Sequence, residues 1–90
     1  MKTIKIKILG TVQGVFFRKF IRDQADKLCV RGFVRNLDNG DVEIVAEGRD
    51  EKVNEMLDVC KKGPAHSTVK QIESREIKHQ GFERFKILRL

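Results

Sequence analysis

The stretch FVRNLDNGDVEIVAE, residues 33–47, decides the fold, because it holds two strand-like runs on either side of a turn signal. The two runs are Phe33–Leu37 and Val42–Glu47, and Asn39-Gly40 lies between them. Asn-Gly favours a tight hairpin because both residues tolerate positive φ angles. The pattern predicts two antiparallel strands in direct succession at the middle of the chain.

An amphipathic helix is predicted on each side of this hairpin. From about Phe16 to Cys29, apolar residues recur every three or four positions, which is typical of a helix with one buried face. Gly32 follows shortly after and suits a helix exit. Asp50 is expected as the N-cap of the second helix. The apolar stripe of that helix consists of Val53, Met56, Leu57 and Cys60, and Lys61-Lys62-Gly63-Pro64 ends it.

Three further strands complete the order. Lys and Ile alternate within Thr3–Leu9, which is the period of a half-buried strand. Val69–Lys78 and Phe85–Leu90 are expected as the last two strands. The order β-α-β-β-α-β plus a terminal strand predicts an α+β, ferredoxin-like sandwich, an antiparallel sheet with two helices on one face. We expect one domain over residues 1–90.

Composition limits the function classes. The formal net charge of +6 favours an anionic partner, although the basic residues are scattered and form no nucleic-acid-binding tract. The N-terminus alternates Lys with Ile and does not resemble a signal peptide, and no apolar run is long enough for a bilayer. A cytoplasmic protein is the expectation. Cys29 and Cys60 lack metal or redox spacing, so buried free thiols are predicted, with a disulfide as the alternative.

The segment GTVQGVFFR, Gly10 to Arg18, joins the first strand to the first helix. Gly10 and Gly14 let the chain curl so that backbone N–H groups converge at the helix N-terminus, where an anion is stabilised. Arg18 in the first helical turn opposes the helix dipole, and it makes sense there if it binds an anion. Glycines that serve turn geometry alone are the alternative explanation.

Two motifs resemble the signatures of the acylphosphatase family. The first is GTVQGVFFR, and the second is Gly32-Phe33-Val34-Arg35-Asn36 followed by Gly40, Val42 and Gly48 at the family's spacing. The resemblance covers essentially the whole chain and implies the same ferredoxin-like fold. Two positions depart from the family: Phe33 replaces a common Trp or Tyr, and the chain ends without the usual terminal Tyr.

The resemblance implies a catalytic site. The family's phosphate-binding arginine maps onto Arg18, and its catalytic asparagine, which orients the attacking water, maps onto Asn36. The phosphate-binding loop maps onto Gln13, Gly14, Val15, Phe16, Phe17 and Arg18. The implied substrate is a small acyl phosphate, with inorganic phosphate as product and competitive inhibitor. A monomer that needs neither metal nor cofactor, and binds neither nucleic acid nor membrane, is expected.

Two other functions are alternatives to this hydrolase. One is a non-catalytic regulatory module, or an acylphosphatase-like module of carbamoyl-transfer proteins. The other is an RNA-binding domain of the RRM type, because Arg31-Gly32-Phe33 begins like an RNP1 motif before departing from it. His66 and His79 are expected to be solvated surface residues, and catalysis through a phosphohistidine is the alternative.

Overall fold

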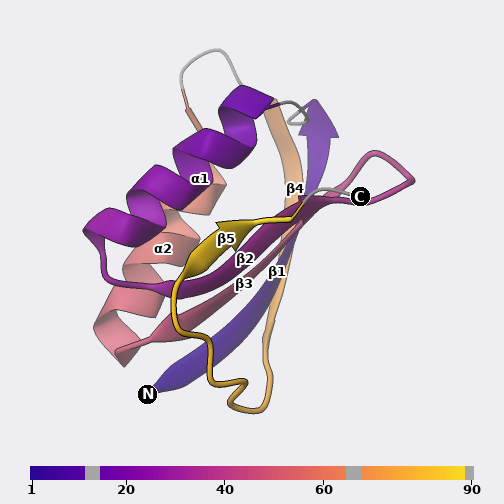
Figure 1. The fold of residues 1–90 in the computed structure, drawn as a ribbon. Helices are drawn as coiled ribbons and strands as arrows, with labels where there is room; N and C mark the ends of the chain where they lie inside the picture. Colours follow the sequence, from indigo (N-terminus) through magenta and orange to yellow (C-terminus); the bar gives the residue numbers. More distant parts are fainter. Residues whose placement is uncertain (12–14, 65–67, 89–90) are drawn as a thin grey trace.

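The computed structural model describes residues 1–11, 15–64 and 68–88, and it has the predicted order of elements (Figure 1). The strands are β1 (Lys2–Thr11), β2 (Arg31–Asn36), β3 (Val42–Gly48), β4 (Thr68–Glu76) and β5 (Phe85–Ile87). The helices are α1 (Val15–Lys27) and α2 (Asp50–Lys62). Both helices cover the same face of the sheet, which is the ferredoxin-like α+β arrangement (Figure 1). In the part of the chain described, no helix is both long and apolar enough to cross a membrane.

The sheet has the strand order β4-β1-β3-β2-β5. The first four strands are mutually antiparallel, as the sequence predicts, but β5 joins the edge of β2 in parallel. The sheet is therefore mixed. The parallel partner was not predicted because nothing in a three-residue strand marks its direction.

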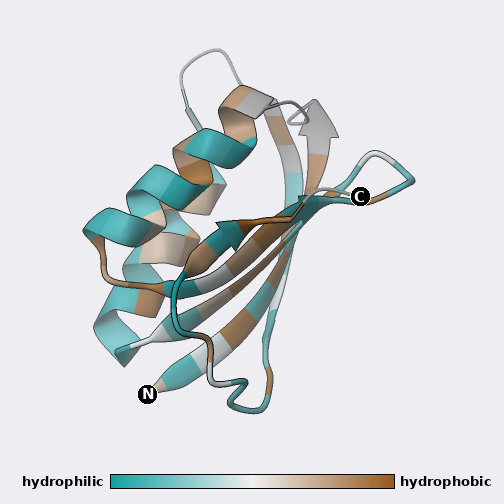
Figure 2. Ribbon diagram, viewed as in Figure 1, coloured by the Kyte–Doolittle hydropathy of each residue, from teal (hydrophilic) through white to brown (hydrophobic). Residues whose placement is uncertain are grey.

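The core lies between the helices and the sheet. Along β1, Ile4, Ile6 and Ile8 face the helices, and each lies opposite a buried residue of β3. The alternation of apolar and polar residues along β1 is visible in Figure 2. The remaining core residues are Phe17, Ile21, Ala25, Val30, Val34, Val42, Ile44, Ala46, Val53, Met56, Cys60 and Phe85. Burial of these side chains stabilises the sandwich because apolar surface leaves water.

Helix α1 ends differently from the prediction. The helix ends at Lys27, and Cys29 takes a positive φ of 56°. The N–H of Val30 donates to the carbonyl of Ala25 (2.9 Å), and the N–H of Cys29 donates to that of Asp26 (3.2 Å). This is the Schellman pattern, with cysteine where glycine is usual.

Gly32, which we expected at the helix exit, lies within β2. Its φ is 142°, and a Cβ there would stand 1.8 Å from the carbonyl oxygen of Val45. The glycine is needed for close strand contact and not for ending the helix.

The start of α2 is also corrected. Asp50 is the first helical residue, and Arg49 is the N-cap, with no side-chain cap hydrogen bond. The end of α2 agrees with the prediction, because Gly63 takes a positive φ of 66° and its N–H donates to the carbonyl of Val59 (2.9 Å).

Candidate active site

Arg18 lies in the first turn of α1, and that turn carries no acidic side chain. The side chain is half-buried, while its neighbour Phe17 belongs to the core. The N–H groups of a helix's first turn have no partners within the helix. In α1 the first N–H groups are those of Val15, Phe16 and Phe17, and they lie where the sequence predicts an anion.

The loop before this helix is only partly described. Gln13 and Gly14, which are predicted to bind phosphate, lie outside the described residues. Of the other loop positions, Val15 begins α1, Phe17 is buried and Phe16 is 85% exposed. Four of the six predicted loop residues, 15–18, are therefore described, and all four belong to the start of α1.

Asn36 is the last residue of β2 and lies on the face of the sheet that the helices cover. It pairs with Val42 of β3, and Val42 pairs with Ile8 of β1, so these three residues share one row. Directly opposed residues of antiparallel strands point to the same face. Asn36 is thus a polar residue that ends an apolar row.

The carbonyl oxygen of the Asn36 side chain is buried, and within the described residues it accepts no hydrogen bond. An unsatisfied buried polar atom costs about 1–3 kcal/mol, so such atoms in folded proteins need a reason. A bound water or substrate group would supply the missing donor.

The register brings Asn36 and Arg18 to the same end of the molecule. Because β1 and β2 both run antiparallel to β3, their C-terminal ends point in the same direction. Two strand spacings of about 4.8 Å separate the Asn36 backbone from that of Ile8. Beyond Ile8, β1 continues to Thr11, and α1 begins at Val15 (Figure 1).

A β-bulge precedes the loop. Leu9 pairs with Gln71 and Gly10 with Val69, so β4 carries one extra residue at this point. A bulge bends its strand and increases the local twist, and bulges often occur beside active sites. Here it redirects the sheet just before the chain turns into α1.

Arg35 does not join the site, although it is next to Asn36 in the chain. Strand alternation places it on the opposite, open face of the sheet. Its Nε donates to Glu43 Oε1 at 2.9 Å, and Lys5 Nζ lies 3.5 Å from Glu43 Oε2. Glu43 is buried and holds both cations on the open face.

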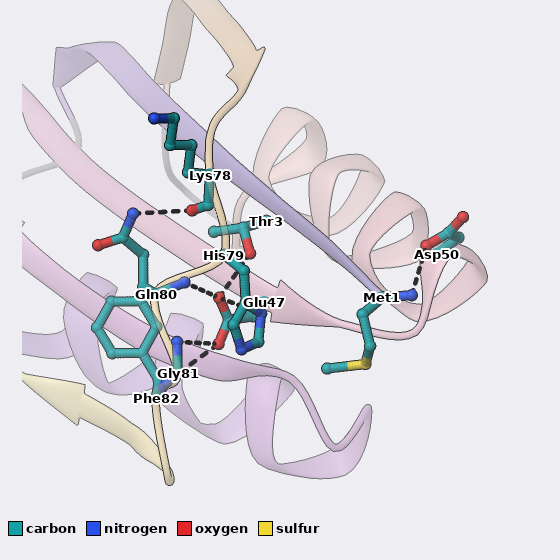
Figure 3. Close-up of polar contacts among 9 residues, drawn as sticks. All are labelled: Met1, Thr3, Glu47, Asp50, Lys78, His79, Gln80, Gly81 and Phe82. Carbon is teal, nitrogen blue, oxygen red and sulfur yellow. Dashed lines mark hydrogen bonds and ion pairs between the residues drawn. The ribbon is translucent and has the colours of Figure 1, made fainter.

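Glu47 is a buried carboxylate that the sequence analysis did not single out. It is fully buried and accepts hydrogen bonds from Thr3 Oγ1 (2.6 Å) and from the N–H groups of Gln80, Gly81 and Phe82 (2.7–3.0 Å) (Figure 3). Burial alone would raise the pKa of Glu47, but these hydrogen bonds and nearby His79 lower it below the ordinary value of 4.5. The carboxylate therefore ties the β4–β5 connection to the sheet. The sequence carries only a weak signal for it, a glutamate at the end of the mostly apolar run Val42–Glu47, and that signal does not reveal its hydrogen-bond partners.

Of the two histidines, His79 is 64% exposed, as expected, and its Nδ1 lies 3.3 Å from Glu47 Oε2. His66 lies outside the described residues.

Both cysteines are free. Cys60 is buried as predicted, and burial raises its pKa to about 12. Cys29 is exposed, so the predicted burial of this residue was wrong. In the described part of the chain, no three His, Cys, Asp or Glu residues gather as metal ligands.

Comparison with known proteins identifies the family. The sequence model of the acylphosphatase family matches residues 4–87. An acylphosphatase of Syntrophus aciditrophicus is 45% identical over 89 residues, which are 98% of this chain and 93% of that protein. The crystal structure of acylphosphatase from Bacillus subtilis superposes with a TM-score of 0.94 at 38% identity, covering 99% of this chain and 100% of that one.

A longer protein contains a similar domain. The crystal structure of HypF from T. kodakarensis matches 97% of this chain with a TM-score of 0.79 and 41% identity, but the match covers only 12% of that protein. The chain belongs to the acylphosphatase family. It is accordingly an acylphosphatase enzyme, and the RNA-binding alternative gains no support from these comparisons.

Proposed function

We propose that this chain, as one domain and a monomer, hydrolyses the carboxyl–phosphate bond of small acyl phosphates without a metal ion. The observation that carries the proposal is the buried side-chain oxygen of Asn36, which has no hydrogen-bond partner among the described residues and lies at the same end of the sheet as the first turn of α1. Arg18 and the N–H groups of residues 13–18 bind the phosphate. Asn36 positions the water.

Each group has a distinct role in the reaction. The guanidinium of Arg18 offers a planar pair of donors to two phosphate oxygens and stabilises their charge as the bond breaks. The Asn36 side-chain oxygen accepts a hydrogen bond from a water and holds it in line with the scissile bond. An amide does not titrate near neutral pH, so Asn36 acts by orientation and not as a general base.

The bond changes balance without a cofactor. The water oxygen attacks phosphorus while the bond between phosphorus and the acyl oxygen breaks. The carboxylate leaves with the electron pair, and the proton of the water passes to solvent. Because a carboxylate is a stable leaving group, the reaction needs positioning and charge stabilisation more than acid catalysis.

Benzoyl phosphate hydrolysis in the presence of EDTA tests the proposal. Arg18→Ala should lower kcat/KM by about 10²–10³, the usual effect of removing one charge-stabilising donor. Asn36→Ala should lower kcat strongly. The matched controls are Arg22→Ala, one turn further along α1, and Asn54→Ala, which is exposed on α2.

Three outcomes would contradict the proposal. Hydrolysis by Arg18→Ala at the parent rate would remove the phosphate-binding role, and an equal loss in Arg22→Ala would show a general effect of charge. A folded parent protein that binds phosphate but does not hydrolyse benzoyl phosphate would indicate the non-catalytic module instead.

A further inference from the structure

A basic hollow lies at the other end of the sheet from the candidate active site. It has a volume of about 780 Å³ and is formed where α1 ends, β2 and α2 begin and the chain enters β5. Arg31, the first residue of β2, lies on its wall, and Asn36 ends the same strand. Five residues of extended strand separate the two ends by about 16 Å.

Five cationic side chains from separate elements line this hollow. They are Lys27, Arg31, Arg49, Lys52 and Arg84. The acidic residues that line it are Asp26 and Glu83, so the lining side chains carry a net charge of +3 (five cations minus two anions). A hollow lined mainly by one sign of charge attracts counter-ions.

Among the described residues, most of these cations have no hydrogen-bond or ion-pair partner. Within the described residues, no hydrogen bond or ion pair is recorded for the side chains of Lys27, Arg31, Arg49 or Arg84, whereas Arg35 and Lys5 are held by Glu43. Lys52 has only a 3.8 Å contact with Glu55 of its own helix. Arg31, Arg49 and Arg84 therefore bring three guanidinium charges to one hollow, where they would attract an anion.

The backbone adds donors at the same place. Arg49 is the N-cap of α2, and its side chain makes no cap hydrogen bond, while its carbonyl accepts from the N–H groups of Lys52 (3.0 Å) and Val53 (2.9 Å). The N–H groups of Asp50 and Glu51 come first in the helix and have no acceptor within it. Of the acidic residues in that turn, Asp50 is paired with the N-terminal ammonium at 3.4 Å. Buried Val30 and Phe85 form an apolar wall, which lowers the local dielectric and strengthens charge interactions.

We infer that this hollow is a second anion site that binds small polyanions, compounds with two or more phosphate or carboxylate groups. The site is independent of the proposed catalytic centre because it shares none of the residues assigned there. A polyanion can therefore occupy it while inorganic phosphate occupies the first turn of α1. Arginines on three different elements favour several anionic groups over a single one.

Titration with tripolyphosphate tests the inference, in the presence of saturating inorganic phosphate and at low ionic strength. Amide chemical shifts should change around residues 27–31, 49–52 and 84. Arg31→Gln/Arg84→Gln should weaken binding by about tenfold or more, because the double variant removes two charged hydrogen-bond donors from the hollow.

The control variant, Lys61→Gln/Lys62→Gln, removes the same charge from exposed residues at the far end of α2, about 18 Å from its start. It should bind tripolyphosphate as the parent does. An equal loss in both variants would show attraction by net charge alone and overturn the inference. Shift changes confined to the first turn of α1 would overturn it as well.

Cys29 offers an independent measurement because it lines the hollow and is exposed, while Cys60 is buried. A thiol reagent should modify Cys29 in the native protein, and tripolyphosphate should slow that modification. An unchanged modification rate at saturating tripolyphosphate would contradict binding at this place. Neither measurement depends on hydrolysis, so failure here would leave the proposed activity standing.

Discussion

Arg35 and Asn36 are neighbours in the chain, yet strand alternation sends them to opposite faces of the sheet. Arg35 is held by Glu43 on the open face, whereas Asn36 ends an apolar row on the face that the helices cover. The same pleat therefore separates a structural ion pair from a candidate catalytic residue. The proposed role of Asn36 rests on its buried side-chain oxygen, for which the described part of the chain supplies no hydrogen-bond donor.

Glu47 is expected to contribute strongly to stability. Glu47→Gln places an NH₂ group or a weaker acceptor against hydroxyl and backbone donors, and we predict a loss of about 2–3 kcal/mol in the free energy of unfolding at pH 7. Denaturant titration measures this loss. Glu76→Gln, which changes an exposed glutamate of β4, is the control and should have little effect.

The loss in the free energy of unfolding caused by Glu47→Gln should depend on pH. Because folding lowers the pKa of Glu47, its carboxylate stabilises the protein above the unfolded-state pKa of about 4.5, and this contribution is lost as pH falls through the lower folded-state pKa. The difference between parent and Glu47→Gln should therefore shrink below about pH 4.5. A difference that stays constant down to pH 2 would contradict the assigned role.

Sequence analysis assigned candidate roles to Arg18 and Asn36 but did not single out Glu47, for a physical reason. The first two lie in motifs whose spacing fits the family. Glu47 gains its partners from residues 3 and 79–82, which are far away in the chain, so its hydrogen bonds depend on tertiary structure. Local pattern cannot reveal such contacts.

At the level of elements, the end of α1 holds a small strain. Cys29 occupies the left-handed position of a Schellman motif, which costs a residue with a Cβ about 1 kcal/mol relative to glycine. We predict that Cys29→Gly raises the free energy of unfolding by up to about 1 kcal/mol. Chemical denaturation of this variant and of Cys29→Ser, which keeps the strain, measures the effect. Equal stability of Cys29→Gly and Cys29→Ser would contradict backbone strain at residue 29.

The contact between β2 and β3 depends on Gly32. Gly32→Ala would place a methyl group against the Val45 carbonyl and would hold an alanine at an unfavourable φ. We predict that the free energy of unfolding falls by about 3 kcal/mol. Gly40→Ala is the matched control, because its φ is 98° but nothing lies within 4 Å of the added carbon. The free energy of unfolding of Gly40→Ala should fall by about 1 kcal/mol, because only the backbone strain is added. Equal losses in thermal unfolding would contradict the steric argument.

The elements themselves were largely predictable, and their ends were not. The period of two in β1 and the three- and four-residue spacing in α1 and α2 come from burying one face, so they are visible in the sequence. Helix ends depend on backbone conformations that several residues can adopt, which is why Cys29 and Arg49 took positions expected of Gly32 and Asp50. The hairpin was predicted, but of Asn39-Gly40 only Gly40 has a positive φ.

On the scale of the whole molecule, the two ends of the sandwich have different chemistry. The first turn of α1 and the end of β2 lie at one end, and five cationic residues line a hollow at the other. The mixed sheet and the basic hollow both depend on how β5 and the β4–β5 connection return to the sheet. Those long-range arrangements could not be predicted from local pattern.

The central claim is that Arg18 binds the phosphate and Asn36 orients the water. Inhibition of benzoyl phosphate hydrolysis by inorganic phosphate tests it most directly, because it separates binding from turnover in each variant. In Asn36→Ala, kcat should fall by about 10² or more while the inhibition constant for phosphate stays within about twofold of the parent. In Arg18→Ala, the inhibition constant should rise by at least about tenfold, since a charge-assisted hydrogen bond is lost. An unchanged inhibition constant in Arg18→Ala, or parent-like kcat in Asn36→Ala, would contradict the account.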